Sequence, residues 1–271
     1  AIIITDFFSA EKFSENFGVK KAKIITSIAM FYDLEDPSKF VSDISKTLDP
    51  DGIWILELSY LPLMLNQNAF DTIVHEHLEY YDLFTIEFLL SKYELKVIDV
   101  QLNDMNGGSF RIFVQHQTKK IDEESLKRIN SIRENEKKLK LDTNIPFNSF
   151  IEQINNEKEK LLKFIQNEVD NGKTIHGYGA STKGNTLLQF YNLDKNLIPF
   201  IADRNPDKWG RKTIGTDIKI ISEEESHSIN PDYYLILPWH FINEFKEREI
   251  NFLKNGGKLL LPLPKFQIIE K

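Results

Sequence analysis

The 271-residue sequence contains no cysteine, which excludes disulfide bonds, a thiol nucleophile and thiolate-bound zinc within this chain. It also has no apolar run near the ~20 residues that a membrane helix needs. The N-terminal Ala-Ile-Ile-Ile-Thr-Asp carries neither a basic segment nor a cleavage signature. We therefore expect a cytoplasmic protein with no membrane partner.

A surplus of basic residues is also missing, since 34 Lys and Arg stand against 41 Asp and Glu, for a net charge of −7. An acidic chain does not attract a phosphate backbone through its overall field, so nucleic acid is not an expected partner. Hydrophobic residues at 41% and charged residues at 28% exclude wholesale disorder. The length exceeds what one hydrophobic core usually supports, and two domains are expected.

The first part of the chain alternates between strand and helix patterns. Buried apolar runs predict strands and amphipathic spacing predicts helices, while Asp49–Gly52 and Asn106–Gly108 carry turn residues. Together they predict the back half of an α/β sheet with an antiparallel last strand. The predicted strands are 22–27, 53–58, 95–100 and 109–114, and the predicted helices are 37–48 and 85–93.

The composition changes at Lys119, after which Lys, Glu and Asn dominate up to residue 145. A single apolar face from Pro146 to Val169 then predicts one long helix, which Asn171-Gly172 ends. A second, Rossmann-like α/β unit follows. We predict domains at 1–118 and 172–271, joined by a helical connector at 119–171. The strands predicted in the second unit are 173–176, 197–202, 233–237 and 258–261, with helices at 186–191 and 241–254.

The glycine-containing run Gly177–Asn185 lies between a predicted strand and a predicted helix, where backbone N–H groups can bind a phosphate. It departs from the dinucleotide fingerprint, which has glycine where Thr182 stands, and from the phosphate-loop motif. A tight turn without a ligand stays an alternative, although Lys183 favours an anion site. Asp203 occupies the place of a ribose-binding acid, and Arg204 meets either phosphate or solvent.

The triplet His75-Glu76-His77 is the sharpest local signal in the first unit. Its histidines are two residues apart rather than four, and no cysteine completes a ligand set, so no metal site is predicted. Two imidazoles and a carboxylate on one loop suit acid–base chemistry near neutral pH, and Tyr80 and Tyr81 add hydroxyls. A hydrogen-bonded structural histidine is the alternative. Of the four isolated histidines, all but His240 are expected to be structural.

Six short segments, taken together in their order, carry a family resemblance. They are Asp6–Ser9, Phe70–Tyr81, Asn106–Arg111, Gly177–Asn185, Ala202–Pro206 and Leu237–Phe241. This set closely resembles the S-adenosylmethionine-dependent sugar C-methyltransferases, a group that includes nucleotide-linked hexose 3-C-methyltransferases of deoxysugar pathways. The resemblance covers essentially the whole chain, and it is specific because six separate motifs keep their order.

The resemblance implies the C-terminal half of a class I methyltransferase (Rossmann-like) sheet, followed by a Rossmann-like C-terminal domain that helps to hold a nucleotide-sugar. It implies His77 as the base, with Glu76 beside it, and His75, Tyr80 and Tyr81 are further catalytic candidates. The base would remove a proton next to a ketone, and the enolate would take the methyl group of S-adenosylmethionine. Asp6 and Phe7 are the expected contacts of the cofactor's adenine end. The expected substrate-binding residues are Gly177, Gly179, Lys183, Gly184, Asn185, Asp203, Arg204, Trp239 and His240.

Three departures from the family pattern matter. Family members begin with a cysteine-rich zinc module and a glycine-rich cofactor strand, and this chain has neither, since its first glycine is Gly18. We therefore expect a chain that begins midway through the methyltransferase domain, binds S-adenosylmethionine weakly or not at all by itself and leaves an aggregation-prone sheet edge. Tyr32 and Asn106 stand where many members have histidine, and Val74 where many have an aromatic residue.

These departures leave the methylated atom open between carbon and oxygen. An O-methyltransferase of the same family is therefore one alternative. A non-catalytic fragment that binds a nucleotide-sugar is another, and a nicotinamide-dependent (NAD) oxidoreductase that uses the Gly177–Asn185 loop is the third. The sequence does not specify the sugar, the nucleotide base or the oligomeric state.

Overall fold

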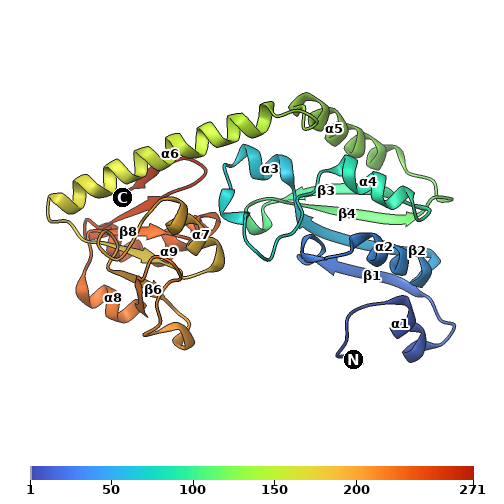
Figure 1. The fold of residues 1–271 in the computed structure, drawn as a ribbon, viewed down its shortest axis with the longest axis horizontal. Helices are drawn as coiled ribbons and strands as arrows, with labels where there is room; N and C mark the ends of the chain where they lie inside the picture. Colours follow the sequence, from blue (N-terminus) through green and yellow to red (C-terminus); the bar gives the residue numbers. More distant parts are fainter. Residues whose placement is uncertain (1) are drawn as a thin grey trace. The chain divides into compact units, whose positions relative to one another are not determined.

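The computed structural model describes residues 2–271, apart from the side chain of Asn106. Ala1, which begins the predicted N-terminal domain, lies outside the described residues. Within the described part, helices connect the strands of two separate sheets (Figure 1). This arrangement confirms the predicted α/β fold class.

The chain divides into two compact units, which we name unit 1 and unit 2. Unit 1 contains the residues up to Leu63 and Glu76–Ile145, and unit 2 contains Met64–His75 and Pro146–Lys271. The division describes packing, so the domain limits drawn from the sequence stay a prediction. Its unexpected feature is that a short N-terminal segment, Met64–His75, packs with the C-terminal residues.

Unit 1 is built on a four-stranded sheet of order β1-β2-β4-β3. β1 pairs in parallel with β2, and β4 is antiparallel to both of its neighbours, as the sequence predicted. Strands β1, β2 and β3 therefore end at one edge, which we name the carboxyl edge of unit 1. The strands are β1 (Ala22–Ile28), β2 (Leu48–Ser59), β3 (Leu95–Asn103) and β4 (Ser109–His116).

The predicted turn at Asp49–Gly52 is wrong as a chain reversal, because these residues lie inside β2. The register joins Ala22 to Leu48 and Ile24 to Ile53, so four residues of β2 face one residue of β1. Within this bulge the Asp49 carboxylate accepts a hydrogen bond from the backbone N–H two residues on, at 2.9 Å. The turn chemistry is present, but the strand continues after it.

The helices of unit 1 pack against β2 and β3 around a core that includes Trp54, Leu56 and Leu83. The predicted connector contains two helices, and the first of them, α5, belongs to this core through Ile129 and Ile132. The few apolar residues of α5 lie on one face of the helix, and this face packs against β3. The composition of the segment, rich in Lys and Glu, does not indicate this packing. The helices are α1 (Ala10–Phe17), α2 (Pro37–Thr47), α4 (Leu83–Ser91) and α5 (Glu123–Leu139), with short 3-10 turns η1 (Phe31–Asp33) and η3 (Met105–Gly107). Helix α3 (Leu61–Asn66) passes from unit 1 into unit 2 after Leu63.

Unit 2 is built on a six-stranded sheet of order β10-β9-β8-β5-β6-β7, parallel except for β10. From β5 the chain winds outward through β6 and β7, and β8 then returns to the other side of β5. The order therefore reverses between β5 and β8, the point at which open α/β sheets bind ligands beyond their carboxyl ends. The strands are β5 (Ile175–Tyr178), β6 (Phe200–Asp203), β7 (Lys219–Ser222), β8 (Tyr233–Ile236), β9 (Lys258–Leu261) and β10 (Gln267–Ile269).

The helix predicted over 241–254 is two helices, because the backbone breaks at Glu249 (φ −93°, ψ 23°). This residue is buried and accepts a hydrogen bond from the Tyr178 hydroxyl at 2.7 Å. The sequence also missed β7, α8 and β10, whose runs are too short for a clear periodicity. The helices are α6 (Ile145–Asp170), α7 (Thr182–Phe190), α8 (Glu223–Ile229), α9 (Ile242–Arg248) and α10 (Ile250–Lys254), with 3-10 turns η2 (Phe70–Thr72), η4 (Pro206–Lys208) and η5 (Trp239–Phe241).

Among residues 2–271, no helix combines the length and the apolar character that crossing a bilayer requires. The longest helix, α6 (Figure 1), carries charged residues from Glu152 to Asp170.

Candidate functional site

The predicted catalytic triplet lies in a turn whose last two residues, Glu76 and His77, belong to unit 1. The carbonyl of Tyr32, in η1 just after β1, accepts hydrogen bonds from the N–H of Leu78 at 2.9 Å and of Glu79 at 3.3 Å. The rings of Tyr32 and His77 are in contact, with centroids 4.4 Å apart. These contacts hold His77 at the carboxyl edge of unit 1, where α/β sheets bind their ligands.

Asp33 joins the triplet as a second carboxylate that the sequence analysis missed. Burial raises the pKa of Asp33, the His77 imidazole acts to lower it, and the Glu76 carboxylate raises it further. The three groups therefore interact electrostatically at one place. Their combination of an imidazole and two carboxylates suits proton transfer. The available signal was the position of Asp33, an acid in the loop directly after a predicted strand.

The two predicted tyrosines have different surroundings. Tyr81 is 2% exposed, its ring packs on Phe31, and its hydroxyl donates to the Glu79 carboxylate. Burial and Glu79 raise the pKa of Tyr81. Tyr80 is half-buried, and burial raises the pKa of its hydroxyl. Tyr81 is thus a core residue with a committed hydroxyl, and Tyr80 is the better candidate for contact with a substrate.

A second group at the carboxyl edge of unit 1, centred on Glu57, was not predicted. Glu57 is 6% exposed, and its Oε2 accepts from Arg111 Nε at 2.7 Å and from Asn103 Nδ2 at 3.0 Å. These residues come from β2, β4 and β3, so the buried carboxylate ties three strands together. The signal was a single acid within the apolar run 53–58.

The predicted cofactor contacts Asp6 and Phe7 lie just before α1. The Phe7 ring is 93% exposed, and the Asp6 carboxylate is 3.5 Å from Lys12 Nζ. An exposed aromatic ring next to a carboxylate offers a stacking surface and an acceptor, the two groups that an adenine or a ribose can use.

In unit 2, packing accounts for the glycines of the predicted phosphate loop. Gly179 has φ +85°, and a Cβ atom there would lie 2.7 Å from Pro238 Cδ. A Cβ on Gly184 would lie 3.1 Å from Leu237 Cβ, so α7 approaches the end of β8 closely. Ser181 caps α7 by accepting from the Gly184 N–H at 3.0 Å. The alternative of a tight turn therefore explains the glycines, and phosphate binding stays a prediction.

Asp203, the predicted ribose-binding acid, organises the same loop. Its Oδ2 accepts from the Ala180 N–H at 2.8 Å and from Lys208 Nζ at 3.3 Å, and its Oδ1 accepts from a backbone N–H two residues on. Lys208 Nζ also donates to the Ala180 carbonyl at 2.6 Å. Arg204 pairs instead with Glu223, at 3.3 Å. A ribose at Asp203 would therefore have to share oxygens that already accept hydrogen bonds.

Three predicted substrate-binding residues, Lys183, Trp239 and His240, gather around Asp71. Trp239 Nε1 donates to Asp71 Oδ2 at 2.9 Å, and Asp71 is 1% exposed. Burial raises the pKa of Asp71 and lowers the pKa of Lys183, and each charge opposes the shift of the other. Burial, with a smaller effect from Lys183, lowers the pKa of His240 to about 4. Asp71 comes from η2, and the sequence analysis did not assign it to this group.

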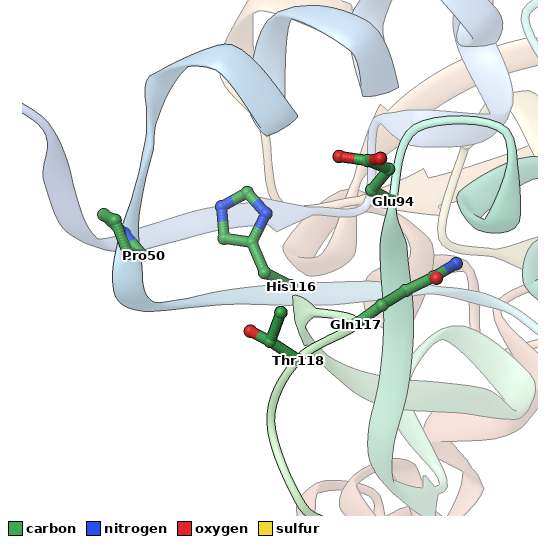
Figure 2. Close-up of a pocket in the computed structure, with 5 residues that line it drawn as sticks. All are labelled: Pro50, Glu94, His116, Gln117 and Thr118. Atoms are coloured by element: carbon green, nitrogen blue, oxygen red, sulfur yellow. The ribbon is translucent and has the colours of Figure 1, made fainter.

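Two cavities lie away from His77 and Asp71. One of about 360 Å³ is lined by Pro50, Glu94, His116, Gln117 and Thr118 (Figure 2). These residues come from the start of β2, the start of β3 and the end of β4, the edge of unit 1 opposite to its carboxyl edge. We do not assign this cavity to the candidate site, because ligands of α/β sheets bind at the carboxyl ends.

A second cavity, of about 460 Å³, lies in unit 2 and includes Arg204 in its lining. Its charged groups are paired with one another. His227 Nε2 is 2.9 Å from Glu249 Oε2, and Arg248 Nη2 is 3.1 Å from Glu223 Oε1. In residues 2–271, no cluster of three or more His, Cys, Asp or Glu side chains is arranged to hold a metal ion.

Comparison with known proteins adds a relative and a family. The chain is 31% identical over 249 residues to the C-methyltransferase NovU of Streptomyces niveus. The alignment covers 92% of this chain and 59% of NovU, so the chain spans about three fifths of the length of this curated relative. The profile of the family described as C-methyltransferase C-terminal domain matches residues 104–264.

Among solved structures, LepI in complex with S-adenosylmethionine has a TM-score of 0.32 at 14% identity, over 37% of this chain and 28% of LepI. LepI bound to S-adenosylhomocysteine and a substrate analogue gives the same values. These likenesses are too slight to support an argument. The family match is sufficient without them, because residues 104–264 are more than half of the chain. The chain therefore belongs to the C-methyltransferase family that this C-terminal domain defines.

Proposed function

We propose that this chain forms part of an S-adenosylmethionine-dependent methyltransferase that methylates a carbon atom of a nucleotide-linked keto sugar. The observation that carries the proposal is the placement of His77, with Glu76 and Asp33, at the carboxyl edge of unit 1. The similarity to a protein named a C-methyltransferase supports carbon as the acceptor.

The chemistry proposed for the chain's own residues is a proton transfer. The His77 imidazole takes the proton from the carbon next to a ketone, and the C–H bonding electrons move to form an enolate. Glu76 and Asp33 orient the ring and stabilise its positive charge. The Tyr80 hydroxyl donates a hydrogen bond to the enolate oxygen. When bound, S-adenosylmethionine supplies an electrophilic methyl group.

The fit of the cofactor to the described residues is partial. Phe7 offers an exposed ring and Asp6 a carboxylate, and these would hold the adenine end. No glycine stands in the turns that directly follow β1 and β2 in residues 2–271, so these turns lack the close backbone approach that glycine permits. Asp6 and Phe7 are therefore the chain's proposed contribution, and we assign no further cofactor contact to it.

The proposed nucleotide-sugar site lies at the carboxyl ends of β5 and β8. The residues after these strands include Gly179, Lys183 and His240, and Lys183 provides the positive charge that a pyrophosphate requires. The pKa of His240 at about 4 keeps its imidazole neutral at physiological pH, suited to hydrogen bonding rather than to charge pairing.

Deuterium exchange tests the proposed base without requiring methyl transfer. The chain is incubated with a nucleotide-linked keto sugar in deuterated water, and exchange at the carbon next to the ketone is followed by NMR. His77→Ala should slow exchange by about 10²–10⁴-fold, the range for loss of a general base. Sugar binding, measured by calorimetry, should change only a few fold.

The matched control is His116→Ala, which removes a histidine from the opposite edge of the same sheet. It should exchange at the parent rate. Equal exchange in the His77→Ala protein would remove His77 from the mechanism. Methyl transfer to a hydroxyl without carbon exchange would establish the O-methyltransferase instead, and thermal stabilisation by NAD alone would establish the oxidoreductase.

A further inference from the structure

The segment that leads into the catalytic triplet is held by unit 2. Within unit 2, Asn68 Nδ2 donates to the Pro264 carbonyl at 3.0 Å, and the Phe70 ring packs on Phe190 and Tyr191 with centroids 4.6 and 5.3 Å apart. The residues of η2 are nearly inaccessible, at 3%, 1% and 5% exposed for Phe70, Asp71 and Thr72. The segment is thus an integral part of the C-terminal packing.

Within unit 2, η2 lies beside the point where the strand order reverses between β5 and β8. Trp239, which donates to Asp71, follows β8, and Lys183 lies on α7, which follows β5. α7 itself packs against η2. The part of a Rossmann-like unit where ligands ordinarily bind therefore also holds, at Asp71, a side chain of the same polypeptide, beside the proposed sugar site.

A carboxylate at the position of Asp71 is energetically unfavourable. Its Oδ2 accepts from Trp239, whereas its Oδ1 is buried with no hydrogen-bond partner. The hydrogen bond from Trp239 and the nearby Lys183 charge offset the cost of burying this carboxylate only in part, since burial still raises the pKa of Asp71. An apolar side chain of similar size would stabilise the packing at least as well. Buried charged groups of this kind are best explained when they specify one arrangement of the chain.

The link from Asp71 to the triplet is short and stiff. The N–H of Ile73 donates to the Phe70 carbonyl at 2.9 Å, and the N–H of Val74 donates to the Thr72 carbonyl at 3.0 Å. No glycine lies between Asp71 and His77. A fixed Asp71 therefore limits where the turn that carries His77 can begin.

We propose that Asp71 and Trp239 are positioning residues for the His75–His77 turn. Asp71 and Trp239 then affect the reaction by fixing the start of the short segment that leads to the base. Loss of the Trp239–Asp71 hydrogen bond releases the segment and lowers the fraction of molecules with His77 in its productive place. This inference rests on the proposed function only for its effect on catalysis.

Trp239→Phe tests the inference, because it removes the indole N–H and keeps an aromatic ring. Hydrogen–deuterium exchange of the backbone amides in residues 72–78 should accelerate by about tenfold, as expected when one hydrogen bond to a buried carboxylate is lost. The matched control is Trp209→Phe in the same unit, which removes the donor to the Asp203 carbonyl at 2.7 Å. It should leave exchange in 72–78 at the parent rate.

Asp71→Asn is the conservative variant, since an amide oxygen still accepts from Trp239. It should keep exchange in 72–78 within about threefold of the parent, whereas Asp71→Leu should match Trp239→Phe. Equal exchange in 72–78 for the parent and Trp239→Phe would overturn the positioning role. So would equal acceleration by Trp209→Phe.

Kinetics separate positioning from direct substrate binding. In the active enzyme, Trp239→Phe should lower kcat by about tenfold with the sugar KM unchanged, because the base is misplaced while the sugar site is intact. A raised KM with unchanged kcat would overturn the inference in favour of sugar binding by Trp239. A parent protein with no exchange of the sugar proton would count against the proposed function alone, since amide exchange still decides the positioning.

Discussion

The two units use their carboxyl edges in different ways. At the carboxyl edge of unit 1, Asp33, Glu76 and His77 interact with one another on loops held by backbone hydrogen bonds. At the carboxyl ends of the strands of unit 2, the side chains of Asp203 and Ser181 accept hydrogen bonds from backbone N–H groups of the Gly177–Asn185 loop. Packing explains the glycines of the motif that resembled a ligand loop, and the triplet that gave the sharpest signal in the sequence of unit 1 lies in a charged cluster.

The difference shows what a loop motif can and cannot indicate. Glycine is needed in a strand–helix turn when another group lies too close for a Cβ atom. That group can be a neighbouring chain segment as well as a phosphate. Packing does not require a histidine beside two carboxylates, so a role in proton transfer is the simpler explanation for this group. The predictions that follow test each side of this comparison.

The largest effect is expected from Lys183→Met, which leaves Asp71 buried without its cation. The free energy of unfolding should fall by about 3 kcal/mol, because the buried Asp71 carboxylate loses the nearby charge that opposes the effect of its burial. Denaturant titration measures it. Lys195→Met is the matched control, because Lys195 pairs with Asp217 on the surface and should matter little. Combining Lys183→Met with Asp71→Asn should recover most of the loss, and failure to recover would show that the two charges are not coupled.

The next effect concerns the reason for Gly179. Gly179→Ala should destabilise the protein by about 2–4 kcal/mol, from a left-handed backbone and a clash with Pro238. Gly172→Ala is the control, since Gly172 has φ +80° and open space around it. Gly172→Ala should lower the free energy of unfolding only through the strain of a left-handed backbone, by about 1–2 kcal/mol. Equal losses in thermal unfolding would mean that Pro238 yields, and that packing does not explain the glycine.

A pH dependence is expected from His176, which is fully buried in β5. Burial lowers its pKa to about 4 from the ordinary 6.5, so acid protonates the unfolded chain first. The stability contributed by neutral His176 is present above pH 6.5 and is lost as the pH falls toward 4, by about 1.4 kcal/mol per pH unit. His176→Asn should flatten this part of the curve in urea titrations at successive pH values. A parent-like curve for His176→Asn would contradict the assignment.

The smallest effect on stability is expected at the edge strand β1 of unit 1. Ile24 and Ile28 are 66% and 49% exposed there, and an apolar strand edge promotes association. Ile24→Lys should reduce light scattering of concentrated protein while leaving its melting temperature nearly unchanged. Ile229→Lys, at a 43% exposed isoleucine at the end of α8, is the control and should not reduce scattering. Scattering that falls equally in both would point to net charge rather than to the edge.

Much of the fold was predictable because periodicity reports local structure. The runs 22–27 and 258–261 gave strands at or near the observed limits, and the apolar face after Pro146 gave α6. The predictions were wrong where a tertiary contact overrode a local signal. Asp49–Gly52 became a bulge because β2 continues alongside β1, and 241–254 broke at Glu249, whose side chain bonds to Tyr178.

The candidate site was predictable only in part. His77 and Glu76 stand next to each other in the sequence, so their type and spacing already indicated acid–base chemistry. Asp33 and Asp71 lie in short 3-10 turns, and apart from the place of Asp33 after a predicted strand little in the local sequence distinguishes them from solvated acids. Their importance depends on burial and on charges brought from distant residues, which a single sequence does not display.

The sequence by itself determined the fold class, most of the longer elements and the residue types available for proton transfer, because these follow from local spacing and side-chain chemistry. Only the tertiary structure decided which groups meet. It assigned Met64–His75 to the C-terminal packing and set Asp71 against Trp239, 168 residues away along the chain. The physical reason is that the free energy of burying a charged group depends on the groups that surround it in the folded protein. Those groups are brought together only by the packing of the whole chain.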